Sequence, residues 1–228
     1  SKINQMSHKM MQEDSEMIVI DPSLASAKQL NLQKQIDLLE DYPYLHLDVE
    51  DGNFVPNITF GMKTISEVAT YTEKQLDAHL MVTDTDSYID ELINAGVKKI
   101  AFHIEAEKYP AVVLQHIRRR GGCAGLAFNE MASVELALPY IDKLDYLLIM
   151  TSEPDGEGQK YNPFLIHKIR QARKLFPPKI SIMVDGGVSE TTMKEVIEAG
   201  ADTLVMGRAV WGAKNPAEKI RELIAQIN

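Results

Sequence analysis

Residues 44–52 read YLHLDVEDG, a stretch that combines an apolar strand pattern with side chains able to bind a metal. Successive side chains of a strand point to opposite faces, so His46 and Asp48, two positions apart, project to the same side. Comparable runs carry His79, in DAHLMV, and Asp185, in MVDGG. Two imidazoles and two carboxylates near the ends of three strands indicate a site for a divalent metal ion.

Outward from this stretch, short apolar runs alternate with amphipathic helical segments along the chain. Candidate strands are the runs at 17–20, 44–49, 75–82, 97–104, 122–128, 145–151, 179–185 and 202–207. Helical periodicity occupies several of the gaps, at 87–96, 110–120, 163–176, 191–200 and 216–226. Regular alternation of strand and helix predicts a parallel sheet with right-handed crossovers.

The number of candidate strands and the missing dinucleotide motif favour a barrel over an open sheet. No strand is followed by the GxGxxG sequence of doubly wound dinucleotide-binding folds. A chain of 228 residues with 45% hydrophobic content suits one well-buried domain. We therefore predict a single-domain α/β protein, a (β/α)8 TIM barrel at residues 17–228, after a polar leader at 1–16 that need not be ordered. In this fold catalytic groups lie at the carboxyl ends of the strands, where the four metal-binding side chains fall.

Composition excludes several classes of partner. The formal net charge is −9, and no basic patch stands out beyond residues 118–120, so nucleic acid is not an expected partner. No apolar stretch approaches the ~20 residues of a membrane helix, and residues 1–16 lack the apolar core of a signal peptide. The single Cys123 cannot form an intramolecular disulfide and suits a reducing compartment, so we expect a cytoplasmic protein.

The proposed ligands have plainer interpretations when each is taken alone. His46 and His79 could be core histidines with satisfied hydrogen bonds, and Asp185 could simply open the turn at Gly186 and Gly187. The coincidence of all four favours a metal such as zinc, iron, manganese or cobalt, because calcium prefers oxygen ligands throughout.

Lysines argue against Schiff-base chemistry in this barrel. Lys98, Lys99 and Lys179 lie at strand starts, at the opposite end from the metal-binding groups, and Lys160 lies in a polar loop. Chemistry through a metal-stabilised enediolate is then the better interpretation.

Seven motifs in order resemble those of the ribulose-phosphate 3-epimerase family of pentose-phosphate metabolism, from about Asp21 onward. They are DPSLASA (21–27), YLHLDVEDGNFVPNITFG (44–61), DAHLMV (77–82), FHIEA (102–106), MTSEPDGEGQKY (150–161), MVDGG (183–187) and MGRAVWG (206–212). The resemblance implies 3-epimerisation of a ketose phosphate, such as ribulose 5-phosphate and xylulose 5-phosphate, by a homo-oligomeric enzyme.

The resemblance also implies roles for the metal-binding residues. His46, Asp48, His79 and Asp185 would bind one divalent metal ion (zinc, iron, manganese or cobalt), and Asp48 and Asp185 would also serve as the acid and the base. Epimerisation beside a ketone removes a proton from one face of the carbon and returns one to the other, so two carboxyl groups must flank the substrate. We expect their strands, the second and the seventh, on opposing sides of the barrel.

Further positions would contact the substrate by the same resemblance. Ser23 would touch the sugar, although it could equally cap a helix, and Met81 and Met150 would line the reaction plane. The phosphate would meet loop glycines and one guanidinium: Gly156, Gly158, Gly186, Gly187, Gly207 and Arg208. Arg208 lies where the family usually has a small hydroxyl residue, and its guanidinium could bind a phosphate directly.

Two departures from the family pattern concern the substrate. Asp155 and Glu157 occupy the phosphate loop, where glycines are expected, and we expect them to face solvent. Glu50 replaces the first of three methionines; it could bind a substrate hydroxyl, raise the pKa of a neighbouring aspartate, or turn away from the site. The chain thus resembles a divergent branch of the family that acts on other sugar phosphates.

Two other functions stay open. The barrel could be a non-catalytic sugar-phosphate binding protein, although a sensor would need neither the metal ligands nor both aspartates. It could also be a related phosphate-binding barrel lyase, a decarboxylase or an aldol-type synthase, but such enzymes usually pair Lys with Asp at strand ends.

Overall fold

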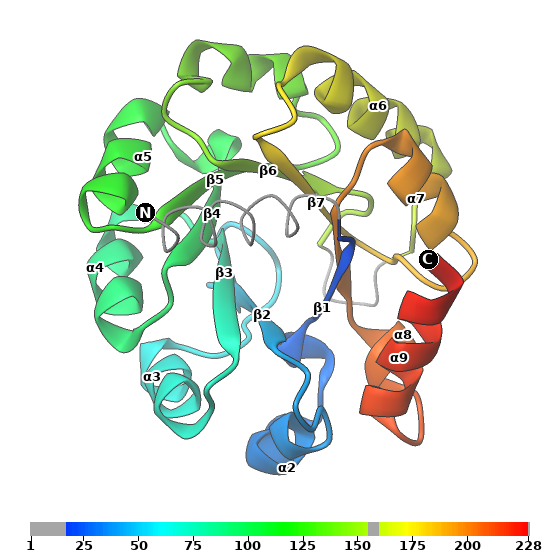
Figure 1. The fold of residues 1–228 in the computed structure, drawn as a ribbon. Coiled ribbons are helices and arrows are strands. Elements are labelled where there is room, and N and C mark those ends of the chain that lie inside the picture. The colour runs from blue at the N-terminus through cyan, green and yellow to red at the C-terminus, as the bar shows by residue number, and fades with distance from the viewer. Residues whose placement is uncertain (1–16, 155–159, 228) are drawn as a thin grey trace, which may run out of the picture.

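Eight parallel strands form one sheet that closes into a barrel, seen along its axis in Figure 1. The computed structural model describes residues 17–154 and 160–227, so the expected leader lies outside the described residues. The strands follow the order β1-β8-β7-β6-β5-β4-β3-β2. A parallel bridge between Ser23 and His46 joins the two ends of this order, next to β1 and within β2. The predicted (β/α)8 fold is confirmed.

Strands and helices alternate along the chain as expected. The strands are β1 Val19–Pro22, β2 Tyr44–Glu50, β3 Gln75–Met81, β4 Lys99–His103, β5 Cys123–Phe128, β6 Tyr146–Met150, β7 Ser181–Asp185 and β8 Thr203–Met206. The α-helices are α2 Leu32–Asp37, α3 Met62–Tyr71, α4 Asp86–Ala95, α5 Pro110–Arg119, α6 Ile166–Leu175, α7 Met193–Ala199, α8 Arg208–Trp211 and α9 Pro216–Ile227.

Two apolar layers hold the barrel together. On β2, Leu45, Leu47 and Val49 are buried against the surrounding helices, whereas the residues between them face the barrel interior. The interior has its own apolar cluster, which includes Tyr146 and Leu148 of β6. Each fully buried aliphatic side chain contributes roughly 1.5–3 kcal/mol, so both layers favour one closed sheet.

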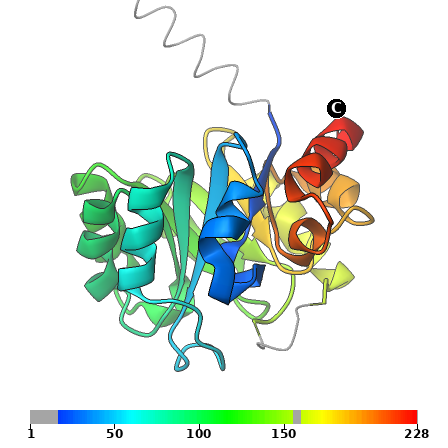
Figure 2. The same cartoon turned by 90° about the horizontal axis from the view of Figure 1, so that it is seen from below.

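The register of the strands places the polar inward positions at one end of the barrel. Asp48 pairs with His79 across β2 and β3, and Met150 pairs with Asp185 across β6 and β7. In the side view, the dark blue segment that leads into β1 lies at one end of the barrel and the cyan loop after β2 protrudes at the other (Figure 2). The side chains expected to bind the metal therefore lie toward the carboxyl ends of their strands.

One expectation about the strands is wrong. In a closed ring of eight, the strand opposite β2 is β6, whereas β7 is reached from β2 through β1 and β8. Asp48 and Asp185 therefore come from strands three places apart in the ring. They approach each other because both side chains project inward from the strand ends.

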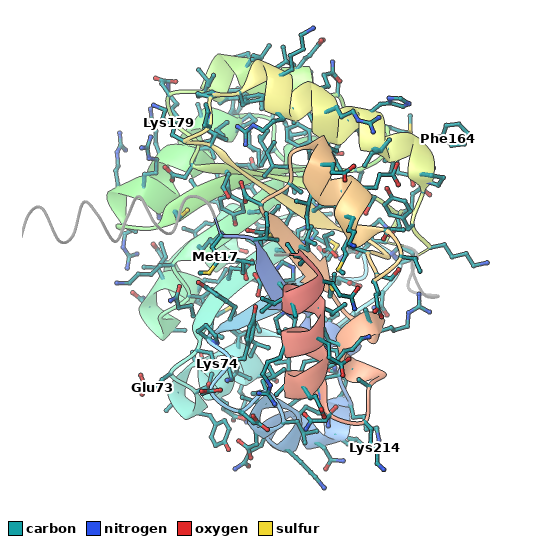
Figure 3. All side chains as sticks on the ribbon, turned by 45° about the vertical axis from the view of Figure 1, so that its right-hand side comes forward. Met17, Glu73, Lys74, Phe164, Lys179 and Lys214 are labelled. Carbon is teal, nitrogen blue, oxygen red and sulfur yellow. The ribbon has the colours of Figure 1, made fainter. Side chains whose placement is uncertain are left out.

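The lysines lie where the sequence places them. Lys99 is the first residue of β4, and its Nζ lies 4.8 Å from the centroid of the Tyr146 ring. In Figure 3, Lys74, Lys179 and Met17, which precede strands, are on one side of the molecule, and Phe164 and Lys214 are on the other.

In the described part of the chain, no helix has the length and apolarity needed to cross a bilayer.

Candidate active site

Four buried side chains converge at the carboxyl ends of three strands. His46 and Asp48 come from β2, His79 from β3 and Asp185 from β7, and one ligand atom of each lies within 4.8 Å of the others. We call these four residues the His/Asp cluster. Alternation along β2 and the pairing of Asp48 with His79 across to β3 bring three of them together.

The spacing of the donor atoms suits a single metal ion. Asp48 Oδ1 lies 3.1 Å from His46 Nε2 and 3.0 Å from His79 Nδ1. Asp185 Oδ2 lies 3.1 Å from His79 Nδ1 and 3.8 Å from His46 Nε2. Ligand atoms about 2.1 Å from a tetrahedral ion are separated by about 3.4 Å, so two nitrogens and two oxygens here fit a divalent transition metal or zinc.

Both histidines of the cluster are held by further polar groups. His46 Nδ1 lies 2.7 Å from Asp77 Oδ2, which leaves Nε2 turned toward the cluster. His79 Nε2 lies 2.7 Å from His103 Nε2, which leaves Nδ1 turned toward the carboxylates. The sequence interpretation missed Asp77, although it lies two positions before His79 on β3 and so shares the inward face. Such contacts orient metal-binding imidazoles in proteins.

The two carboxyl groups of the cluster differ in their acidity. Burial alone would raise the pKa of Asp48, but the charges and hydrogen bonds of His46 and His79 lower it well below its usual value. Burial and the nearby charge of Asp48 raise the pKa of Asp185, against an opposing hydrogen bond from His79. An ionised and a more basic carboxyl side by side are typical of acid–base pairs.

The histidines are also perturbed. Burial would lower the pKa of His79, but its hydrogen bonds to Asp185 and Asp48 raise it to about 9. His103 lies against His79 without a carboxylate of the cluster as partner, and burial lowers its pKa to about 4. A positive charge is thus favoured on His79, within the cluster, and disfavoured on His103, next to it.

A cavity of about 690 Å³ opens over the cluster. Its walls include Asp48, Asp185 and five other residues that the sequence assigned to the substrate or its neighbourhood, namely Ser23, Glu50, Gly187, Gly207 and Arg208. They also include polar residues that the sequence did not single out: Asn57, Thr59 and Ser189. Met81 and Met150 are fully buried and are not among the lining residues.

Ser23 and Glu50 face the cluster. The Ser23 hydroxyl donates to Asp48 Oδ2 at 2.5 Å, and it makes no capping hydrogen bond to the following helical turn. Glu50 is half-buried, lines the cavity and does not turn away; its Oε2 accepts a hydrogen bond from Asn57 Nδ2 at 2.8 Å. Burial raises the pKa of Glu50, with Asp48 adding to the shift and Asn57 opposing it.

The glycines after β7 are required by close packing. A Cβ on Gly186, at φ +126°, would lie 2.5 Å from Ser152 Oγ, and one on Gly187, at φ +67°, would collide with the backbone nitrogen of Tyr161. Gly207 packs in the same way against the side chain of Ser26. Gly156 and Gly158, with Asp155 and Glu157, lie outside the described residues.

Comparison with known proteins identifies sequence relatives over most of the chain. Residues 19–211 match the model of the "Ribulose-phosphate 3 epimerase family". A ribulose-phosphate 3-epimerase from Schizosaccharomyces pombe is 37% identical over 209 residues, which cover 90% of this chain and 91% of the relative. One from Bacillus subtilis is 36% identical over 213 residues, covering 91% and 98%.

Solved structures with low sequence identity share the fold. Orotidine 5'-phosphate decarboxylase from Pyrococcus horikoshii aligns with a TM-score of 0.67 at 16% identity, covering 92% of this chain and 99% of the other. The 3-hexulose-6-phosphate synthase from Salmonella typhimurium aligns with a TM-score of 0.69 at 19% identity, covering 92% and 100%. At this identity the likeness establishes the barrel alone.

Proposed function

Because the chain belongs to the ribulose-phosphate 3-epimerase family and is therefore an isomerase, we propose that it inverts carbon 3 of a ketose phosphate. The observation that carries the proposal is the pair of buried carboxyl groups, Asp48 and Asp185, which lie beside two histidines and line one cavity. The five-carbon pair ribulose 5-phosphate and xylulose 5-phosphate is the first candidate substrate.

The His/Asp cluster would hold one divalent ion, and its two nitrogens and two oxygens suit zinc, iron, manganese or cobalt. When bound, such an ion supplies positive charge to the substrate oxygens on which negative charge develops as carbon 3 loses its proton. Asp77 holds the His46 ring in position, so that Nε2 stays turned toward the cluster.

Asp48 and Asp185 would move the protons. One ionised carboxylate takes the proton from carbon 3, leaving the electron pair in an enediolate, and the other carboxyl group returns a proton to the opposite face. Ser23 donates to Asp48 Oδ2, which leaves Oδ1 as the oxygen turned toward the histidines. The reverse reaction exchanges the two roles.

The phosphate would bind away from these carboxylates, at the side of the cavity formed by Gly187, Gly207 and Arg208. Backbone N–H groups and a guanidinium suit a dianion, whereas Glu50 would repel it. The sugar would then lie with its phosphate toward Arg208 and its hydroxyl groups toward Glu50.

Neither alternative function gains support from the site. A Schiff-base or lysine-assisted lyase needs an amine at the reacting carbon, and the described residues that line the cavity include no lysine. A binding protein would not need Asp48 and Asp185 buried together at some cost in charge repulsion. The homo-oligomer and the cytoplasmic location stay predictions.

Proton NMR in deuterated water tests the proposal. Metal-loaded protein is incubated in turn with the phosphates of ribulose, xylulose, allulose, fructose and tagatose. Loss of the carbon-3 proton signal to deuterium, with appearance of the 3-epimer, supports the proposal and identifies the substrate. No exchange with any of these sugars, although the metal is bound, would argue against it.

A further inference from the structure

A line of three side chains leads from the His/Asp cluster to the loop after β4. His79 Nε2 lies 2.7 Å from His103 Nε2, and His103 Nδ1 lies 3.2 Å from Glu105 Oε2. The other carboxylate oxygen, Glu105 Oε1, accepts a hydrogen bond from the backbone N–H of Asn129 at 2.7 Å. Both histidines are fully buried, so their mutual contact is shielded from bulk water, whereas the Glu105 side chain at the end of the line is 29% exposed.

The chemistry of these atoms fixes where each proton lies once a metal is bound. His79 turns Nδ1 toward Asp48 and Asp185, so Nδ1 must offer its lone pair to a metal and Nε2 must carry the proton. His103 Nε2 then accepts a hydrogen bond from the N–H of His79. Neutral His103 carries its own proton on Nδ1, facing Glu105. An ionised carboxylate accepts hydrogen bonds and never donates them, so Glu105 is the final acceptor of the line. Each N–H in the line then points away from the cluster.

We propose that Glu105, acting through His103, is a positioning residue that sets the tautomer of His79 for metal binding through Nδ1. The inference rests on the metal site of the proposed function but not on its substrate. Phe54 covers His103 from the loop after β2, with ring centroids 4.9 Å apart, and helps to hold the imidazole in the line. His46 has its own carboxylate, Asp77, in direct contact, so each histidine of the cluster is oriented by a separate acid.

The substitution Glu105→Gln separates this role from simple packing. The Asn129 N–H can only donate, so it will keep the single amide oxygen of the glutamine. The amide NH2 then faces His103 Nδ1, which must accept, and the proton of His103 moves to Nε2. His79 Nε2 must accept in turn, which leaves a proton on Nδ1 where the metal should bind. A nearly isosteric substitution thus reverses the direction of both hydrogen bonds in the line.

The experiment combines zinc affinity with imidazole NMR. Zinc affinity of the full chain is measured by chelator competition for the wild type, Glu105→Gln and the matched control Glu107→Gln. Glu107 lies in the same loop, and besides burial the groups that shift its pKa are Thr85, Asp86 and Asp84 rather than a histidine. Long-range ¹H–¹⁵N spectra of the zinc-loaded proteins report which nitrogen of His79 and of His103 carries the proton, independently of any enzymatic activity.

We expect Glu105→Gln to weaken zinc binding about 10- to 100-fold, the usual cost of losing such a contact, while Glu107→Gln binds as the wild type does. In the wild type, His79 should be protonated on Nε2 and His103 on Nδ1. Zinc affinity of Glu105→Gln within twofold of the wild type would overturn the proposal. So would a His103 proton on Nε2 in the zinc-loaded wild type, which decides the matter even if the variant does not fold. Epimerase activity is assayed separately, so a protein that binds zinc in this way but epimerises nothing would refute only the proposed function.

Discussion

Asp48 and Asp185 sit together but in different chemical states, and that difference follows from their neighbours. Two histidines and the Ser23 hydroxyl surround Asp48, whereas Asp185 meets the negative charge of Asp48 and a single close imidazole, His79. The structure thus places a carboxyl group of lowered pKa and one of raised pKa in the same cluster, and no lysine or cysteine is among the described residues that line the cavity.

The first prediction concerns these two carboxyl groups. Under the proposed mechanism, Asp48→Asn or Asp185→Asn should lower kcat by about 10²- to 10⁴-fold, because each removes one of the two groups that would transfer a proton. Each variant should still exchange the carbon-3 proton of one epimer with deuterated water, since the remaining carboxylate serves one face. Epimerisation and exchange are measured together by NMR, with circular dichroism and metal analysis as controls for folding and loading. Wild-type epimerisation by both variants would contradict a two-base mechanism.

A second prediction concerns Glu50. If it accepts a hydrogen bond from a substrate hydroxyl, Glu50→Met should raise KM about 10- to 100-fold, the cost of a hydrogen bond to a charged group, and leave the pH profile of kcat in place. If it instead raises the pKa of an aspartate, the same variant should shift the acidic limb of that profile to lower pH. Steady-state kinetics across pH distinguish the two outcomes, and Glu107→Gln controls for loss of a carboxylate outside the cavity.

At the scale of residues, strand alternation indicates which side chains share a face, whereas contacts made in loops follow no such pattern. His46 and Asp48 could be paired because i and i+2 share a face on β2. Asn57 meets Glu50 only because the loop after β2 folds back over the strand end through the bridge between Asp51 and Ile58. No periodic pattern encodes that return.

The loops at the carboxyl ends of β6 and β7 pack backbone against backbone, and glycine is what permits it. Gly187→Ala should destabilise the protein and weaken substrate binding, because its φ of +67° is strained for alanine and its Cβ would also collide with Tyr161. Gly121→Ala is the matched control, with φ +77° but nothing within 4 Å of the new Cβ. We expect about 1 kcal/mol for Gly121→Ala and roughly 1–3 kcal/mol more for Gly187→Ala, measured by urea unfolding. Equal losses would show that the loop yields to the added methyl group.

Helices α4 and α5 are joined by a pH-dependent contact. His116 of α5 lies 2.7 Å from Asp86 and 2.9 Å from Asp90, both of α4, and Arg120 also contacts Asp90. Hydrogen bonding to Asp86 raises the pKa of His116, against a smaller effect of burial and with Asp90 adding to the rise.

A group whose pKa is higher in the folded protein than in the unfolded chain stabilises the fold at low pH. That contribution is complete below the unfolded pKa, near 6.5, and is lost as pH rises through the higher folded value. His116→Gln should therefore lower the midpoint of urea unfolding at pH 6 and leave it close to that of the wild type at pH 9. The effect will be small because the side chain of His116 is 29% exposed. A deficit that grows with pH would contradict the assignment.

The elements themselves were predictable in kind but not at every boundary. The first strand, expected at 17–20, runs from Val19 to Pro22 because it pairs with β8 as far as Met206. Between β5 and β6 the crossover is a 3₁₀ helix, Val134–Tyr140, in which Pro139 prevents the hydrogen bonding of a regular α-helix. Propensity sets the type of element, and pairing in the closed sheet sets where it begins and ends.

At the scale of the whole molecule, the barrel brings together groups that no local pattern connects. Asp185 is 137 residues after Asp48 in the sequence (185 − 48), yet both lie against His79 Nδ1. Closure of β1 against β2, with the apolar cluster inside the barrel, holds these strand ends around one site. The number of strands could be counted from the sequence. Which strands face β7 across the site could be seen only from the closed ring.

This arrangement predicts that metal binding stabilises the entire fold. The cluster holds two carboxyl groups and two imidazoles away from solvent, and the unfolded chain cannot present them in this geometry. Zinc at about 100 times its dissociation constant should therefore add about 2.7 kcal/mol to the free energy of unfolding, seen as a rise in Tm with zinc concentration by calorimetry. His79→Gln should abolish the rise, because it removes the ligand that contacts both carboxylates, whereas His116→Gln should keep it. A Tm independent of zinc in the wild type would mean that the folded barrel gains no binding energy from the metal, and the four buried side chains would then be a polar network held by hydrogen bonds alone.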